Sequence, residues 1–228
     1  MPILSYILTA LGAYLLGSIP FGFLVAKAKG IDIRAVGSGN IGATNAMRVL
    51  GKPAGIFVLL MDALKGYAAV AWIALFIFFQ FSPERFWEHP SFDDIQLRSE
   101  LATRFMVLAG IFAVLGHNYT CWLKFKGGKG IATTAGVYLA LAPVPLLIAL
   151  GVFILALLAS RIVSVASMSA AVVLPVAVWV MTPHNLFLGI VTTALGALAI
   201  YKHKSNIQRL MAGTENRFGQ KKSTEAKK

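Results

Sequence analysis

Long apolar runs separated by short polar segments make up this chain. Seven of the runs are long enough, or nearly long enough, to cross a bilayer as α-helices. They cover residues 3–25, 54–81, 102–121, 131–142, 144–159, 164–182 and 186–201. The pattern predicts an all-α polytopic integral membrane protein with seven transmembrane helices in a single transmembrane domain, residues 1–228.

Two prolines, Pro143 and Pro145, separate the runs at 131–142 and 144–159. Proline ends or kinks a helix, because it lacks an N–H group and its ring clashes with the preceding turn. We therefore expect two short helices here, each shorter than an ideal span. Such helices fit a membrane if they are tilted, if the bilayer is locally thinned, or if they form a re-entrant hairpin packed against neighbours.

The composition agrees with a membrane protein. Hydrophobic residues make up 57% of the 228 residues and charged residues only 13%, about half of their share in soluble domains. The formal net charge of +12 does not require nucleic acid, because the basic residues cluster in short segments between the apolar runs. The single cysteine, Cys121, excludes an intramolecular disulfide. The first run lacks a positive leading region and a clear cleavage site, so we interpret it as a retained span.

The charges between the runs predict the orientation of the chain. Basic residues dominate 26–53, 122–130 and 202–228, whereas acidic residues dominate 82–101. Because cytoplasmic loops carry an excess of Lys and Arg, we expect the three basic segments inside and the acidic segment outside. This places the N-terminus outside, and the C-terminus with its basic tail in the cytoplasm.

Three polar segments on the predicted cytoplasmic side are unusually rich in glycine, amides and cations. The first segment runs from Arg34 to Lys52. Its glycines let the backbone turn tightly and present N–H groups, while its side chains add neutral and cationic donors. Its candidate binding residues are Gly37, Ser38, Gly39, Asn40, Gly42, Thr44, Asn45 and Arg48.

A helix that begins near Asn40 would bring Thr44, Asn45 and Arg48 together on one face. Backbone amides at a helix start, with an arginine one to two turns later, suit a phosphate group. The alternative is close packing of small residues between helices, helped by Gly51 and Gly55. Packing alone does not call for a serine, two asparagines and an arginine in one segment.

The second segment, residues 116–130, ends in F-K-G-G-K-G. A glycine turn around Gly128, flanked by Lys126 and Lys129, suits a phosphate or an acyl-phosphate group. We exclude nucleotide hydrolysis, because a Walker A motif needs Ser or Thr after its lysine and here glycine follows. The alternative is an ordinary basic loop of the cytoplasmic side.

The third segment, residues 202–219, follows the last apolar run. Its candidate residues, within two helical turns, are His203, Ser205, Asn206 and Arg209. Histidine can act as a general base or orient a substrate hydroxyl, and Asn206 is its neighbour at i, i+3. Glu215 is placed to orient a nearby Arg or Lys. The alternative is a basic helix that lies on lipid headgroups.

Polar residues inside two of the predicted spans are further candidates. Asp62 and Lys65, at i, i+3, are costly in lipid, so we expect them to pair or to face a cavity. Ser164, Ser167 and Ser169 lie at the inner end of the sixth run. Serines in such positions often only return a hydrogen bond to the helix backbone.

Five motifs, taken together and in order, are similar to those of one known family. They are G-S-I-P-F-G-F-L-V-A-K, G-S-G-N-I-G-A-T-N-A-M-R-V-L-G, G-H-N-Y-T…K-F-K-G-G-K-G-I-A-T, R-I-V-S-V-A-S-M and H-K-S-N-I-Q-R-L-M-A-G-T-E-N. From about residue 12 to residue 218, the chain resembles the bacterial acyl-phosphate:glycerol-3-phosphate acyltransferases.

The resemblance implies transfer of an acyl group from acyl phosphate to the 1-hydroxyl of sn-glycerol 3-phosphate. This reaction gives lysophosphatidic acid and phosphate in the first step of phospholipid biosynthesis. The resemblance also implies a multi-pass protein of the bacterial cytoplasmic (inner) membrane, with its active site at the cytoplasmic face and no metal or other cofactor. The partners are then acyl phosphate, glycerol 3-phosphate and membrane lipid, without nucleic acid. Transient contact with an acyl-phosphate-producing enzyme is left open.

The candidate site residues form two groups. The catalytic group comprises Ser38, Arg48, Lys129, His203 and Asn206. The substrate-binding group comprises Gly37, Asn40, Thr44, Asn45, Lys126, Gly128, Ser164, Ser167, Ser205 and Arg209. The family's active-site positions match Ser38, Thr44, Arg48, Lys129, Ser167, His203, Ser205 and Asn206 here. Ser164 stands one helical turn from Ser167 and is the alternative site serine.

The chemistry of the two substrates fits the three polar segments. Both substrates carry a phosphate, so one pocket must hold two anions. An acyl phosphate is an activated mixed anhydride, so positioning and charge stabilisation can carry most of the catalysis. No Ser-His-Asp arrangement is evident and Cys121 has no evident partner, so we predict direct transfer without an acyl-enzyme. The hydroxyl proton goes either to the donor's own phosphate or to His203.

Two other functions are alternatives to the acyltransferase. A transporter or flippase for a phosphorylated anionic metabolite would need polar residues through the depth of the helix bundle. Here the polar segments gather on one predicted side. A phosphatidyl-group transferase would need repeated aspartates on a helix to hold its metal ions, and the sequence shows no such repeat.

His89 and Asp94 match the H-x-x-x-x-D pair of the soluble-headed glycerolipid acyltransferases. They lie in the segment predicted outside, so we interpret the match as coincidence.

Overall fold

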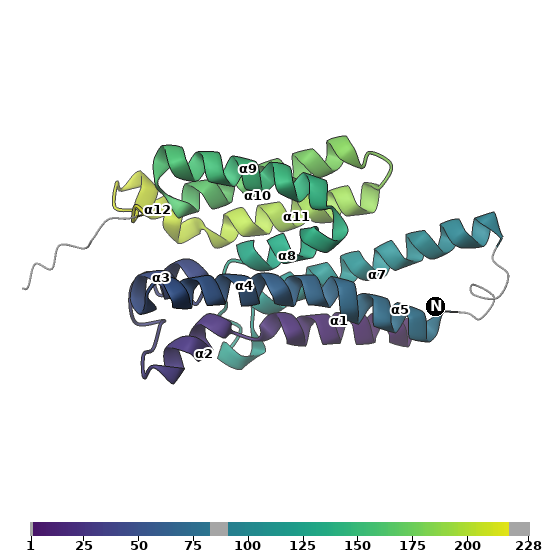
Figure 1. Ribbon diagram of the computed structural model, residues 1–228, viewed down its shortest axis with the longest axis horizontal. Helices are drawn as coiled ribbons and strands as arrows, with labels where there is room; N and C mark the ends of the chain where they lie inside the picture. The colour runs from purple at the N-terminus through teal and green to yellow at the C-terminus, as the bar shows by residue number, and fades with distance from the viewer. Residues whose placement is uncertain (1, 83–90, 219–228) are drawn as a thin grey trace, which may run out of the picture. The chain divides into compact units, whose positions relative to one another are not determined.

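The computed structural model describes residues 2–82 and 91–218, and every regular element among these residues is a helix (Figure 1). The prediction of an all-α protein is therefore confirmed. The chain groups into two compact units, Met1–Leu146 and Leu147–Lys228. One domain over the whole chain stays a prediction.

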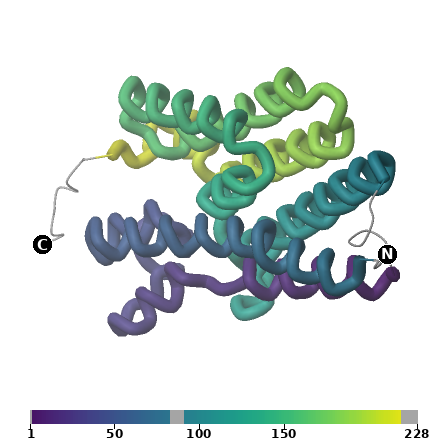
Figure 2. Tube along the Cα trace, turned by 45° about the vertical axis from the view of Figure 1, so that its right-hand side comes forward, coloured from purple at the N-terminus to yellow at the C-terminus, as the bar shows by residue number. Residues whose placement is uncertain are grey.

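Close contacts between helices in the unit Met1–Leu146 run through glycines. Its elements are α1 (Ile3–Ser18), α2 (Phe21–Ala28), α3 (Ala43–Leu50), α4 (Lys52–Ala68), the π-helical η1 (Ala69–Ala74), α5 (Leu75–Phe81), α7 (Phe92–Asn118), the 3₁₀ turn η2 (Cys121–Leu123) and α8 (Ile131–Leu141). α1 packs on α7 where Gly17 meets the backbone of Ala113. α8 lies beside α4 (Figures 1 and 2), where Gly136 meets the backbone of Ala63. A larger side chain at either glycine would overlap the opposite helix, so small residues let these helices approach.

The unit Leu147–Lys228 is built on the contact between α10 and α11. Its elements are α10 (Val163–Met181), α11 (Leu186–Lys202) and α12 (Lys204–Met211), preceded by α9 (Pro143–Ser160), which begins just before the unit boundary. Trp179 of α10 donates from Nε1 to Thr193 Oγ1 of α11 at 3.0 Å, and its ring lies against Gly189. The axis of α12 is bent by 52° from that of α11, and His203 stands at the bend.

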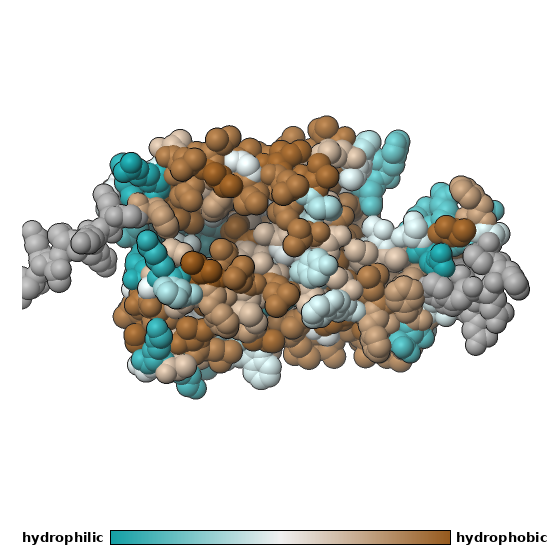
Figure 3. Space-filling view, in the orientation of Figure 1, coloured by the Kyte–Doolittle hydropathy of each residue, from teal (hydrophilic) through white to brown (hydrophobic). Residues whose placement is uncertain are grey.

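The helices present the surface of a membrane protein. Among the described residues, five helical stretches are long and apolar enough to cross a bilayer, or six if α11 and α12 form one bent span. Large apolar side chains point outward along them, for example Trp72 (64% exposed), Leu158 (71%) and Val180 (74%). In Figure 3, hydrophobic side chains cover the helices along their length and hydrophilic ones gather near helix ends. Lipid is the environment that such a surface requires. Seven crossings and the orientation stay predictions.

The acidic segment predicted as a loop at 82–101 is partly helical. α7 begins at Phe92, because Ser91 and Asp94 form a capping box and two aspartates in the first turn favour the positive end of the helix dipole. The S-x-x-D spacing was visible in the sequence and was missed. Asp94 uses its carboxylate in this cap, and His89 lies outside the described residues.

The run after the two prolines is longer than predicted. α9 covers 18 residues and is long enough to span, because Pro143 and Pro145 fall in its first turn, where a missing N–H costs nothing. Of the two helices predicted to be short here, only α8, with 11 residues, is so. The basic tail predicted within 202–228 is described as far as 218, and residues 219–228 lie outside the description.

Candidate active site

The first polar segment is folded around the side chain of Asn45. The Oδ1 atom of Asn45 accepts the backbone N–H of Ser38 at 2.8 Å. Its Nδ2 group lies within hydrogen-bond distance of the carbonyl oxygens of Ile33, Val36 and Asn40, at 3.2, 3.2 and 2.9 Å. Gly37 and Gly39, with φ of +64° and +71°, make the reversals that bring the chain around this amide.

The helix in this segment begins at Ala43, three residues later than predicted, and the three residues expected to act together on it differ in exposure. Thr44 and Arg48, at i, i+4, are both exposed, and Ser38 is exposed on the preceding turn. Asn45 is 1% exposed and is turned inward. The structure therefore gives Asn45 a task in shaping the loop, while Ser38, Thr44 and Arg48 remain accessible to a ligand.

The second polar segment is a tight loop closed on itself by backbone hydrogen bonds. The N–H groups of Gly127 and Gly128 donate to the carbonyl oxygens of Asn118 and His117 at 3.2 and 3.0 Å. A side chain at Gly128 would overlap the His117 ring, and one at Gly127 would overlap the His117 carbonyl oxygen. Only glycine fits at these two positions, which explains why the predicted glycine turn has this sequence. Within it Lys126 is exposed and Lys129 half-buried.

The first and second segments share one hydrophobic cluster. Leu123, in the turn just before the glycine loop (residues 125–130), packs in the same buried cluster as Ile41 and Ala46 of the first segment. Ile33, which directly precedes that segment, belongs to the cluster too. Ala26 and Val58 complete the cluster. Ala46 and Leu123 are 77 positions apart in the sequence, and the fold of Met1–Leu146 brings them together.

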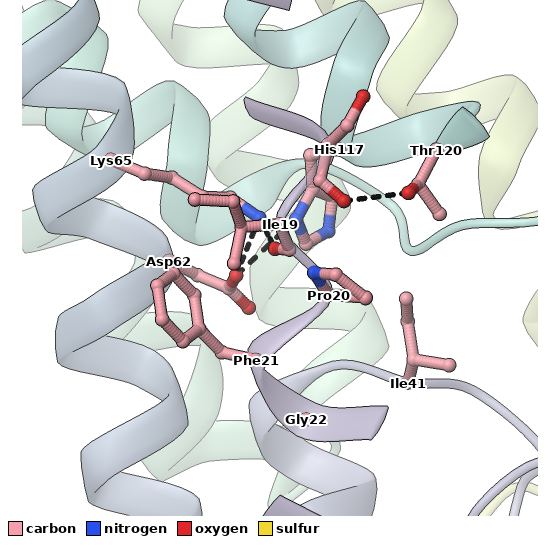
Figure 4. Close-up of a pocket in the computed structure, with 10 residues that line it drawn as sticks. Ile19, Pro20, Phe21, Gly22, Ile41, Asp62, Lys65, His117 and Thr120 are labelled. Atoms are coloured by element: carbon pink, nitrogen blue, oxygen red, sulfur yellow. Dashed lines mark hydrogen bonds and ion pairs between the residues drawn. The ribbon is translucent and has the colours of Figure 1, made fainter. Parts of the chain in front are cut away.

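Beneath these segments lies a buried charged cluster that surrounds a small pocket (Figure 4). Lys65 Nζ is 2.8 Å from Asp62 Oδ1, so the predicted pairing of these two residues is confirmed. His117 Nδ1 lies 3.5 Å from the same oxygen, and all three side chains are at most 6% exposed. The pocket is lined by Ser18, Ile19, Pro20, Phe21, Gly22, Ile41, Asp62, Lys65, His117 and Thr120. Sequence reasoning missed His117, whose only signal was its place at the start of the second polar segment, residues 116–130.

The third polar segment belongs to Leu147–Lys228 and is organised by Glu215. Its Oε1 atom accepts from Ser164 Oγ at 3.0 Å and from Asn206 Nδ2 at 2.6 Å, and its Oε2 atom pairs with Arg209 Nε at 2.6 Å. The expectation that Glu215 orients a nearby arginine is confirmed. Of the two candidate serines, Ser164 joins this network, and Ser167 is also buried, with 4% exposed. Ser205 is exposed on α12.

The histidine of this segment stands at the bend between α11 and α12. His203 is 3% exposed, and its Nδ1 atom lies 2.7 Å from the carbonyl oxygen of Ala199. Because a carbonyl oxygen can only accept, Nδ1 carries the hydrogen of this bond. In the neutral ring Nε2 is then the acceptor nitrogen, which is the atom that a general base would use.

Replacing Glu215 by glutamine is expected to lower the thermal midpoint at pH 7 by roughly 2–4 °C, the shift that about 1 kcal/mol produces in a chain of this size. It should also flatten the pH dependence of stability. Partial burial raises the pKa of Glu215, but the hydrogen bonds from Asn206, Arg209 and Ser164 outweigh it and leave the pKa below its ordinary value.

The sign of the pH effect follows from this lowered pKa. The stability that Glu215 contributes is fully present above its unfolded pKa and is lost as the pH falls through the lower folded pKa. Thermal unfolding in detergent between pH 7 and the acid range measures it. Parallel pH profiles for the wild type and Glu215→Gln would contradict this account.

Comparison with known proteins places the chain in a family. The family model described as glycerol-3-phosphate acyltransferase matches residues 7–213. The chain belongs to the glycerol-3-phosphate acyltransferase family. The glycerol-3-phosphate acyltransferase of Geotalea daltonii is 42% identical over 214 residues, which cover 94% of this chain and 98% of the relative. That of a Synechococcus strain is 44% identical over 223 residues, which cover 96% of this chain and 97% of the relative.

Crystal structures of one member of the glycerol-3-phosphate acyltransferase family are similar to this chain. They show PlsY (YgiH), an integral membrane glycerol 3-phosphate acyltransferase, in its glycerol 3-phosphate and lysophosphatidic acid forms. The TM-scores are 0.77 and 0.75, with 38% and 37% identity, and both comparisons cover 94% of this chain and 96% of the other. The integral membrane fold predicted from the apolar runs is thus that of a solved family member.

Proposed function

We propose that this protein transfers an acyl group from acyl phosphate to the 1-hydroxyl of sn-glycerol 3-phosphate, giving lysophosphatidic acid and inorganic phosphate. Membership of the glycerol-3-phosphate acyltransferase family supports acyl transfer to glycerol 3-phosphate as the activity. The two forms of PlsY support glycerol 3-phosphate as acceptor and lysophosphatidic acid as product. The acyl phosphate donor rests on the resemblance of the five sequence motifs to the acyl-phosphate:glycerol-3-phosphate acyltransferases. The direct mechanism rests on the reactivity of such a donor, which needs no acyl-enzyme.

The observation that carries the proposal is the shared core of the first two polar segments. Ser38, Thr44 and Arg48 are exposed on a loop and helix that pack through Ile41 and Ala46 against the turn before the glycine loop. The same unit therefore presents an arginine and two lysines from segments fixed to one another. Two phosphate-bearing substrates require this concentration of donors and positive charge.

In the unit Met1–Leu146 we assign phosphate recognition to three cations. Arg48 supplies a planar fork that matches phosphate oxygens, and Lys129 supplies a point charge at the end of the glycine turn. Lys126 adds a second charge on that turn. Ser38 and Thr44 supply neutral donors, and Gly37, Asn40 and Gly128 hold the backbone open around them.

In the unit Leu147–Lys228 we assign substrate orientation to polar side chains held by Glu215. Asn206 and Arg209 each donate a hydrogen bond to Glu215, which orients both side chains. The guanidinium of Arg209 has further N–H groups that can donate to a substrate. Ser205 is exposed and directly precedes Asn206 in the sequence. Ser164, rather than Ser167, is the serine tied to this network.

The proposed transfer takes place in one step without an acyl-enzyme. The 1-hydroxyl oxygen of glycerol 3-phosphate forms a bond to the acyl carbonyl carbon, and the bond from that carbon to the bridging phosphate oxygen breaks. Phosphate leaves with the electron pair and takes the hydroxyl proton. Because the leaving group is already activated, holding the two substrates in line and neutralising their charges supplies most of the rate enhancement.

A pair of substitutions at His203 tests where the proton goes. His203→Asn keeps an amide donor for the carbonyl oxygen of Ala199, whereas His203→Ala removes the donor as well. If the released phosphate takes the proton, His203→Asn should keep kcat within about tenfold of the wild type, because loss of a general base typically costs about 10²–10⁴. A loss in that larger range for His203→Asn, in protein of wild-type stability, would make His203 the base.

We also propose a topology and a location for this reaction. α8 would be the seventh crossing beside the six apolar stretches, with the N-terminus outside and the C-terminus in the cytoplasm. The bacterial inner membrane, with the site at its cytoplasmic face, gives access to acyl phosphate and to a lipid phase for the product. An acyl-phosphate-producing enzyme is the transient partner that this location would allow.

A transporter or flippase of a phosphorylated metabolite is the alternative from another class. One assay separates the two functions. Purified protein in detergent, given acyl phosphate, should release phosphate only when glycerol 3-phosphate is added, and a transporter would release none. Vesicle uptake of glycerol 3-phosphate without phosphate release would favour the alternative.

A further inference from the structure

The proposed chemistry leaves unused the buried cluster of Asp62, Lys65 and His117 beneath the two phosphate-suited segments. We propose that this cluster is a positioning device that holds the glycine loop and the first polar segment in a fixed relation. The inference rests on the proposed function, because the relation matters only if Lys129 and Arg48 act on the substrates together.

One end of the device is the break between α1 and α2. Pro20 cannot donate a hydrogen bond, so α1 ends at Ser18 and carbonyl groups at its end need other donors. Lys65 Nζ donates to the carbonyl oxygen of Ile19 at 2.8 Å, and Thr120 Oγ1 donates to that of Ser18 at 2.6 Å. The break is thereby tied to α4 and to the residues that follow α7.

The break sets the position of the first polar segment. α2 starts directly after Pro20, and a side chain at Gly22 would overlap the carbonyl oxygen of Ile41. Ile41 also lines the pocket together with Asp62, Lys65 and His117 (Figure 4). Lys65 fixes the backbone at this break through Ile19. If the backbone moved there, α2 would displace the segment that carries Ser38 and Arg48, because Gly22 is in close contact with Ile41.

The other end of the device is the glycine loop. Asp62 Oδ1 lies between Lys65 Nζ and His117 Nδ1, at 2.8 and 3.5 Å. The opposite edge of the His117 ring, at Nε2, fills the space where a side chain at Gly128 would lie. The His117 carbonyl oxygen accepts the N–H of Gly128 at 3.0 Å. The His117 ring thus lies between Asp62, on its Nδ1 side, and the glycine loop next to Lys129, on its Nε2 side.

Packing alone does not explain these charges. Ionisable groups within a membrane-spanning helix are costly, and apolar residues of similar size can often replace a buried ion pair without loss of stability. An apolar pair could not donate to the Ile19 carbonyl oxygen or face the His117 ring with a charge. The cluster does both at once, which is what a positioning role requires.

The test compares single and paired removal of the charges. Asp62→Leu leaves Lys65 buried without its anion and should lower the thermal midpoint, whereas Asp62→Leu with Lys65→Met should recover most of it. The double variant should still show kcat/KM for glycerol 3-phosphate lowered by at least about tenfold, because a displacement of about 1 Å can cost as much as about 10²-fold. Asp32→Leu with Arg34→Met, the same two types of change on an exposed ion pair of the same unit, should alter neither quantity.

A second variant keeps the test decisive if the double variant does not fold. His117→Asn leaves the Asp62–Lys65 pair intact and removes the ring that supports Gly128. It should keep a near wild-type thermal midpoint and show the same loss of kcat/KM. Wild-type kcat and KM in a stable double variant, or in His117→Asn, would overturn the proposal and leave the cluster with a structural role only.

Hydrogen exchange gives a readout that does not depend on the reaction. Peptides that cover residues 117–130 should exchange faster in the double variant or in His117→Asn than in the wild type, while those from α10 and α11 should not change. Unchanged exchange at 117–130 would also overturn the proposal. If the wild type proves inactive with acyl phosphate, the proposed donor fails, yet the exchange result still decides the positioning role.

Discussion

Replacing Arg48 by methionine is expected to lower kcat/KM with acyl phosphate and glycerol 3-phosphate by about 10²–10³, the range typical for losing one preorganised charge-stabilising donor. Arg48 is exposed on α3 one turn after Thr44. The side chain of Asn45 fixes this helix to the preceding loop by hydrogen bonds with the backbone of Ser38 and Asn40. Methionine keeps the apolar stem but removes the fork that pairs with phosphate oxygens. The loss should therefore be catalytic, with the thermal midpoint little changed.

A matched arginine gives the control for this result. Arg34→Met removes a guanidinium from the same segment, but Arg34 is half-exposed and pairs with Asp32 at 2.9 Å. Since exposed ion pairs contribute little, this variant should keep the activity and stability of the wild type. Steady-state kinetics on both variants checks the prediction. Full activity and an unchanged KM for glycerol 3-phosphate in Arg48→Met would remove the first segment from the site.

The second large effect is expected for Gly128→Ala, with kcat/KM lowered by about 10²-fold through displacement of the loop. The added methyl group would overlap Nε2 of the buried His117 ring, which is held between helices and cannot yield cheaply. The loop must therefore move, and it carries Lys126 and Lys129. Kinetics and thermal unfolding of the purified variant measure both consequences.

Gly151→Ala is the matched control for the glycine loop. Gly151 lies within α9, and apart from its chain neighbours and the nearby backbone of its own helix no heavy atom would lie within 4 Å of the added methyl group. Alanine is a better helix former than glycine by about 1 kcal/mol, so this variant should be active and slightly more stable. If Gly128→Ala were as active as Gly151→Ala, the tight loop would not be part of the catalytic machinery.

Much of the fold could be predicted from hydrophobic pattern alone, because a helix in lipid must be apolar along its whole length. The runs at 131–142, 164–182 and 186–201 correspond to α8, α10 and α11 within a residue or two. Hydrophobic pattern did not predict the short helices α2, α3 and α12 or the start of α7. Their ends depend on caps, prolines and contacts with distant residues rather than on hydrophobicity.

The candidate site was predictable where its residues are close in the sequence. Asp62 and Lys65 pair because they are one turn apart, and Glu215 reaches Arg209 across a short turn. His117 joins Asp62 from 55 positions away, and Ser164 meets Glu215 from 51 positions away. Only the packed fold brings such pairs together. Asn45 was predicted to bind substrate, whereas its side chain bonds to the backbone of the preceding loop. These contacts depend on turns that cannot be read from the sequence.

The most direct test of the central claim is the identity of the acyl donor. Purified wild-type protein in detergent would be given glycerol 3-phosphate with either an acyl phosphate or an acyl thioester of the same chain length, and both products would be measured. Our account predicts lysophosphatidic acid and inorganic phosphate in equal amounts from the acyl phosphate, and no product from the thioester. Lysophosphatidic acid formed from the thioester, or none formed from the acyl phosphate, would contradict it.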